Sequence, residues 1–154
     1  MKQKIIKHLN FYYYGMMLLA VLVATLAYFL IVKEYVQVIE PASSLGQIIQ
    51  YVVIFDALIT IPLGLYWCKR RCVKLSLLTD EEAKLLGYKK AATLRILLVC
   101  NAMVFAMAAF YLMGAYQSML WIAAISAIGW YFTKPTLQKM ELELQPTDPN
   151  AEQY

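Results

Sequence analysis

Asp56 is the residue whose type and position most directly suggest chemistry in this sequence. It lies in the middle of a long apolar stretch, about 16 Å from the start of that stretch at Leu45 if the stretch is helical. A charged carboxylate at the centre of a bilayer costs roughly 2.5 to 3.5 kcal/mol, so Asp56 is expected to be protonated, paired or turned towards a water-filled cavity.

Asn101 and Thr60 are the expected hydrogen-bond partners of Asp56. Asn101 lies at a similar depth in the next apolar stretch, and Thr60 follows Asp56 by one helical turn. We favour a structural polar contact between helices, which is worth about 0.6 kcal/mol on average. Two alternatives remain: a proton or cation site beside a helix kinked at Pro62, and a contact with a polar group of another membrane subunit.

The cysteines and the single histidine predict neither a metal site nor a cofactor. Cys68 and Cys72 are four residues apart and could share a helical face, but no cluster of cysteine or histidine completes a four-ligand set. His8 alone cannot supply two axial ligands to a haem. No phosphate-binding loop or nucleophile elbow is present either, so an enzyme is not predicted.

The composition indicates that these residues are positioned by helices in a membrane. Of the 154 residues, 62% are hydrophobic and 16% are charged, whereas a soluble domain is about half apolar and a quarter charged. We therefore predict an all-α integral membrane protein, a four-helix bundle made of two antiparallel helical hairpins. Residues 1–144 form one domain, with spans at about 9–32, 45–68, 91–113 and 117–133.

The basic residues orient these spans in the membrane. Outside the spans, Lys33 is the only lysine or arginine on one side, and the other side carries Lys2, Lys4, Lys7, Lys69, Arg70, Arg71, Lys74, Lys84, Lys89, Lys90, Lys134 and Lys139. Cytoplasmic loops carry the excess of positive charge, so a multi-pass protein of the cell (inner) membrane is predicted, with a cytoplasmic N-terminus and C-terminus. Arg95, near the inner surface, is expected to snorkel towards it. This topology explains the net charge of +4 without a nucleic-acid partner.

The segment 69–90 is predicted to be cytoplasmic and to contain a short helix, which can continue into the third span with at most a bend at Gly87, because no proline separates the two. Its basic residues are expected to contact anionic lipid headgroups, namely Lys69, Arg70, Arg71 and Lys74. Thr79 and Glu82 have the spacing of a capping box that would start the short helix, as Ser44 and Gln47 would start the second span. The polar end of the chain, 145–154, is predicted to be disordered.

Pairs of alanines four residues apart predict close helix packing, either within the bundle or between subunits. They are Ala20 and Ala24, Ala102 and Ala106, and Ala123 and Ala127. The predicted function is that of a structural or accessory subunit, or of a self-associating membrane protein whose partners are the lipid bilayer and another membrane protein or a second copy. The alternative is a small proton- or cation-coupled transporter that uses Asp56.

Overall fold

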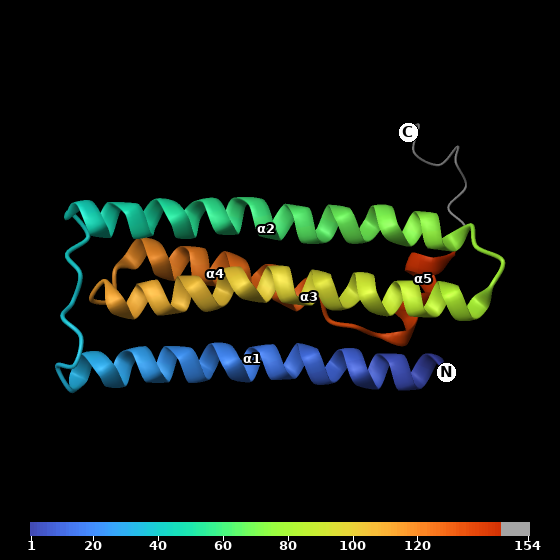
Figure 1. Cartoon of the computed structure of the whole chain (residues 1–154), viewed down its shortest axis with the longest axis horizontal. Coiled ribbons are helices and arrows are strands. Elements are labelled where there is room, and N and C mark those ends of the chain that lie inside the picture. The colour runs from blue at the N-terminus through green and yellow to red at the C-terminus, as the bar shows by residue number, and fades with distance from the viewer. Residues whose placement is uncertain (146–154) are drawn as a thin grey trace.

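The structure, a computed structural model, describes residues 1–145, which contain five helices and no strand. The helices are α1 (Lys2–Val32), α2 (Ser44–Ser76), α3 (Glu81–Leu112), α4 (Gln117–Phe132) and α5 (Leu137–Leu144) (Figure 1). The prediction of an all-α chain is confirmed for this range. Apart from Gln145, the tail predicted to be disordered lies outside the described residues.

Three of the helices are long and apolar enough to cross a membrane. They are α1, α2 and α3, with 31, 33 and 32 residues. Many apolar side chains of α1 and α2 are exposed on the outside of the molecule, as expected for surfaces that face lipid, whereas those of α3 are mostly buried or half-buried. The fourth predicted span, α4, has 16 residues and is about 24 Å long, less than the hydrocarbon thickness of roughly 30 Å.

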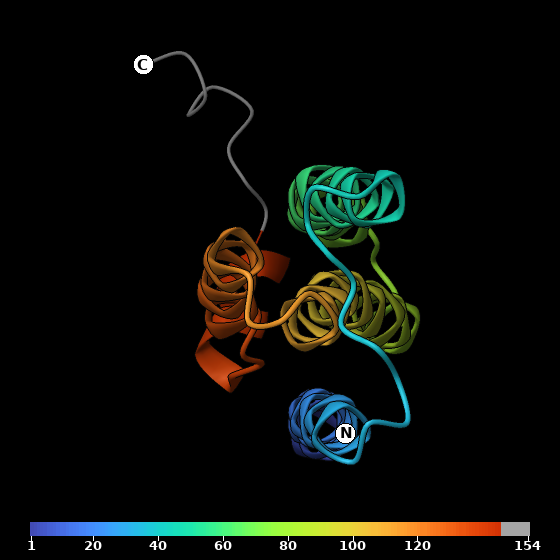
Figure 2. The same cartoon turned by 90° about the vertical axis from the view of Figure 1, so that its left-hand side faces the viewer.

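The helix at the centre of the molecule is α3, which packs against α1, α2 and α4 (Figures 1 and 2). This arrangement differs from the two predicted hairpins, because α3 lies between α1 and α2 and keeps them apart. The linker 33–43 crosses the end of α3, where the backbone N–H of Ile39 donates to the carbonyl of Leu112 at 2.9 Å. Both α2 with α3 and α3 with α4 form antiparallel hairpins through connections of four residues, 77–80 and 113–116. In the second of these turns Gly114 and Ala115 have φ of 66° and 61°.

The predicted short cytoplasmic helix is not a separate element. The basic residues after Cys68 continue α2 as far as Ser76, and the expected short helix is the beginning of α3. No proline interrupts either segment, and helical hydrogen bonding therefore propagates from the apolar part of each helix into its polar end. A connection of four residues, 77–80, is all that remains of the predicted loop.

Both predicted helix starts are displaced by one residue. Asp80, rather than Thr79, caps α3, and its carboxylate accepts a backbone N–H at 2.9 Å. Ser43, rather than Ser44, caps α2, and its hydroxyl accepts a backbone N–H at 3.0 Å. In each case a neighbouring residue with a short polar side chain satisfies a free N–H at the helix end.

The fifth helix, α5, was not predicted; it returns to the end of the molecule that holds the N-terminus and packs against α2 and α1. The chain reaches it from α4 through Thr133 and Pro135, which are buried, and the Thr136 hydroxyl accepts the backbone N–H of Lys139 at 3.2 Å to cap it. The buried residues around it form what we call the inner core, which consists of Ile5, Ile6, Leu9, Tyr13, Cys68, Cys72, Leu85, Tyr88, Ala91, Ala92, Ile96, Cys100, Met140 and Leu144.

Candidate functional site

Asp56 of α2 and Asn101 of α3 face each other across the contact between these two helices. The side-chain amide of Asn101 lies close enough to the Asp56 carboxylate to interact with it, and both side chains are half-buried. The second carboxylate oxygen, Oδ2, is buried and has no hydrogen-bond partner among the described residues. The structure therefore brings this predicted pair together and leaves one polar atom of Asp56 unsatisfied.

Thr60 and Pro62 do not contribute to this pair. The Thr60 hydroxyl donates to the backbone carbonyl of Asp56 at 2.7 Å, so this proton is used within α2 and does not reach the carboxylate. Pro62 lies inside α2, which continues through it as one helix, and its ring is exposed. Helices tolerate proline in this way when the carbonyl that it leaves free is satisfied by local adjustment.

The four basic residues expected at the lipid headgroups lie on the last turns of α2. All four side chains, Lys69, Arg70, Arg71 and Lys74, are exposed. The guanidinium of Arg70 lies 4.8 Å from the ring centroid of Tyr66, and that of Arg71 lies 5.1 Å from the ring of Trp67. These cation–π contacts hold the positive charges against aromatic residues of the kind that favour a membrane interface.

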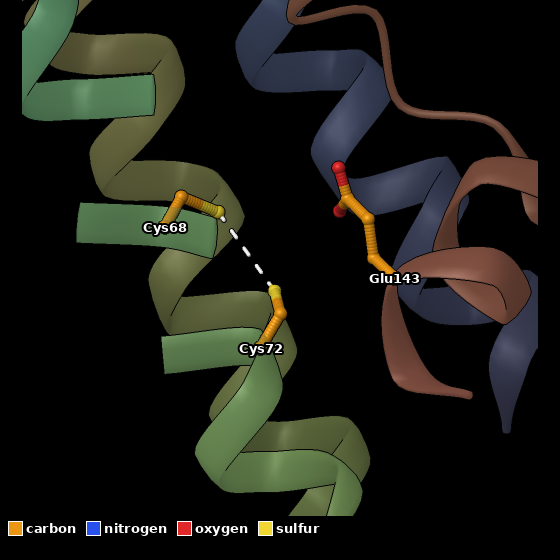
Figure 3. Close-up of side chains that lie close together, drawn as sticks. All are labelled: Cys68, Cys72 and Glu143. Carbon is orange, nitrogen blue, oxygen red and sulfur yellow. Dashed lines mark hydrogen bonds between the residues drawn. The ribbon is translucent and has the colours of Figure 1, made fainter. Parts of the chain in front are cut away.

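A second group of polar side chains, which was not predicted as a set, lies in and beside the inner core. The Sγ atoms of Cys68 and Cys72 are 4.0 Å apart on α2. Glu143 of α5 points towards them (Figure 3), and the two sulfurs and a carboxylate oxygen all lie within 4.8 Å of one another. Both thiols are buried and the carboxylate is half-buried. We call these three residues the Cys-Cys-Glu cluster.

Arg95 of α3 joins the cluster through an ion pair with Glu143. Its Nη1 donates to Oε1 of Glu143 at 2.8 Å, and the Arg95 side chain is only 5% exposed. The prediction that Arg95 snorkels to the inner surface is therefore wrong, because α5 folds back and brings a carboxylate to the guanidinium inside the protein. Nε and Nη2 of Arg95 and Oε2 of Glu143 are buried without a hydrogen-bond partner among the described residues.

Two further residues set the electrostatics around the cluster. Tyr88 is fully buried beside Glu143, and its hydroxyl makes no hydrogen bond to a described residue. Lys139 donates from Nζ to the backbone carbonyl of Phe132. Burial, and after it the positive charge of Arg95, lower the pKa of the Lys139 ammonium.

The spacing of Leu137, Met140 and Leu144 is the signal that could have revealed α5 and with it Glu143. Apolar residues at these intervals lie on one face of a helix, and Thr136 is a suitable N-cap. No local signal could have paired Arg95 with Glu143. The two are 48 residues apart, and their contact depends on the chain turning back after α4.

The Asp56 pair and the Cys-Cys-Glu cluster lie at different depths of the molecule. Cys68 follows Asp56 by twelve residues along α2, so it lies about 18 Å nearer the inner end. The two sites can therefore be altered independently of each other. The chain matches no protein-family model, and no curated protein or solved structure was found to be similar to it.

Proposed function

We propose that this chain is a four-span protein of the cell membrane with both termini in the cytoplasm. The linker 33–43 and the turn after α3 lie at one end of the molecule, and the N-terminus, the connection 77–80 and α5 lie at the other (Figure 1). The excess of lysine and arginine at the second end supports a cytoplasmic location for it. The short α4 crosses with local thinning of the bilayer, which has a modest free-energy cost.

Reporter fusions distinguish four crossings from three. Green fluorescent protein fused to the C-terminus is expected to fluoresce in bacterial cells, and alkaline phosphatase at the same point is expected to be inactive, because its disulfides form only outside the cytoplasm. A phosphatase fusion truncated after Ala115, in the turn before α4, serves as the control and should be active. Phosphatase activity at the C-terminus would contradict the crossing by α4.

Within the membrane, the proposed role is structural and non-enzymatic, as an accessory subunit or a self-associating protein. The main support for this role is the position of Asp56, which faces Asn101 across the contact between α2 and α3 although a carboxylate in the membrane has a high free-energy cost. An apolar groove of about 450 Å³ between α1 and α4 also offers surface to a helix of a second copy or of another membrane protein. Its lining includes Ala24, Met107 and Ala127. The exposed basic residues at the end of α2 would contact anionic headgroups.

A small proton- or cation-coupled transporter is the second candidate function. It is favoured by the unsatisfied Oδ2 of Asp56, which is buried at mid-depth in α2. A carboxylate in the membrane with a free oxygen can accept a proton or contact a cation. The two functions differ in what they require of Asp56: the structural role needs only a hydrogen bond, whereas transport needs an exchangeable charge.

Asp56→Asn is expected to leave both folding and association unchanged. An amide is close in shape to the carboxylate and can still accept a hydrogen bond from Asn101. In mild detergent, the variant should show the wild-type pattern of cross-linked species and the same thermal unfolding. In vesicles with an entrapped pH dye, wild type and variant should both leak protons no faster than empty vesicles. Wild-type proton flux that disappears in Asp56→Asn would establish the transporter instead.

A further inference from the structure

We propose that Cys68, Cys72 and Glu143 bind one thiophilic divalent cation, of which zinc is the best match, and that this ion ties α5 to α2. Two thiolates on a tetrahedral zinc ion are separated by about 3.8 Å, given a Zn–S bond of roughly 2.3 Å. The observed sulfur–sulfur distance is 4.0 Å. The carboxylate oxygen, within 4.8 Å of both sulfurs, needs to move by only about 1 Å to reach the corresponding sulfur–oxygen separation of roughly 3.6 Å.

The orientation of Glu143 leaves one oxygen available to a metal ion. Its Oε1 accepts a hydrogen bond from Arg95, while Oε2 is buried and has no partner among the described residues. A ligand carboxylate held by a second residue in this way is typical of metal sites, because the outer contact fixes its direction. Cys68, Cys72 and Glu143 would provide three protein ligands, and a water molecule would complete the tetrahedron.

Arg95 makes the charge balance of the site favourable. Without a metal, two neutral thiols lie beside the ion pair of Arg95 and Glu143, so the group as a whole is neutral. On binding, each thiol releases its proton to the solvent, two metal–sulfur bonds form, and the divalent charge replaces the two protons. The net charge of the buried group is unchanged, so metal binding adds no net charge to the protein interior.

The ligand set selects against the common hard cations. Magnesium and calcium are bound through oxygen ligands, whereas thiolates favour zinc and related soft ions. The two sulfur ligands belong to α2 and the oxygen ligand belongs to α5, so an ion in this position joins two helices that are separated in sequence. The inference is independent of the proposed role in the membrane, because it concerns only the inner core.

Titration of the metal-free protein with cobalt(II) tests the site. The full chain in mild detergent, first treated with a chelator under reducing conditions, is expected to bind one cobalt ion and to develop the charge-transfer absorption of cobalt–thiolate bonds. Zinc should abolish this absorption at one equivalent. Cys68→Ser and Cys72→Ser should each remove most of the absorption, whereas Cys100→Ser, which alters another buried thiol of the inner core, should leave it unchanged.

Glu143→Gln separates the role of the carboxylate from that of the thiols. The variant should keep cobalt–thiolate absorption but bind at least about tenfold more weakly, because the loss of an outer-shell contact alone costs ten- to a hundredfold. Equal loss of absorption in Cys100→Ser, or unchanged absorption in the Cys68→Ser/Cys72→Ser double variant, would overturn the proposal. Zinc-edge X-ray absorption of the wild-type protein does not depend on variants that fold poorly, and a coordination shell without sulfur would also refute the site.

Discussion

Glu143→Ala is expected to destabilise the protein by about 3–5 kcal/mol, because it leaves the guanidinium of Arg95 buried without its counter-charge. The effect should be measured as a fall in the midpoint of thermal unfolding in mild detergent, with a chelator present so that metal binding does not contribute. Most of the loss comes from the unpaired charge, so the Arg95→Met/Glu143→Leu double variant should recover much of the wild-type stability.

Glu141→Ala is the matched control for this prediction. Glu141 lies two residues away on the same helix and forms an ion pair with Lys2 at 3.6 Å, but the two side chains are 54% and 47% exposed. Such exposed pairs contribute about 0–1 kcal/mol, since water and salt screen them. If both alanine variants unfolded at the same temperature, Arg95 would not depend on Glu143 for its burial.

Ala123→Leu is expected to destabilise the hairpin of α3 and α4 by about 1–3 kcal/mol. Ala123 is 1% exposed and packs in the outer half of the bundle together with Val53, Ala106 and Met119. A leucine at this position must push α4 away from α3, because the packed interior has no space for three further carbon atoms. Within a membrane this loss of close packing matters more than a change in hydrophobic burial, since lipid is as apolar as leucine.

A leucine at the neighbouring position 124 serves as the control, because it adds the same side-chain volume at an exposed site of α4. Ala124 is exposed on α4, so Ala124→Leu should change the unfolding temperature very little. Both variants can be compared by thermal unfolding in detergent and by susceptibility to proteolysis of the turn before α4. Equal destabilisation by the two leucines would show that α4 does not pack against α3 through the face that contains Ala123.

The sequence predicted the helices well and their arrangement poorly. Apolar stretches bounded by charge identified α1 to α4, because a bilayer of fixed thickness requires apolar segments of a certain length. The polar ends of the first three helices extend beyond the predicted spans: α1 begins seven residues earlier, α2 ends eight residues later and α3 begins ten residues earlier. Pairing is decided instead by side-chain packing. All-apolar helices carry little information on which neighbour each will contact, so the insertion of α3 between α1 and α2 could not be predicted.

The two candidate sites also differ in how far the sequence alone predicts them. Asp56 is conspicuous because a single carboxylate in an apolar helix has a high free-energy cost, and depth along the helix was enough to suggest Asn101. Only part of the Cys-Cys-Glu cluster could be predicted from the sequence. The spacing of Cys68 and Cys72 could be read from the sequence, but Glu143 is supplied by a short helix whose return to α2 is a property of the whole fold.

The central position of α3 has a consequence for the biogenesis of the protein. The ribosome makes α1 and α2 first, yet each packs mainly against a helix that has not been synthesised when they enter the membrane. Helices that are individually stable in lipid can remain inserted without packing against each other, and helix association follows as a second stage. We therefore expect the first half of the chain to insert as two unassembled helices, which can pack only when α3 has been synthesised.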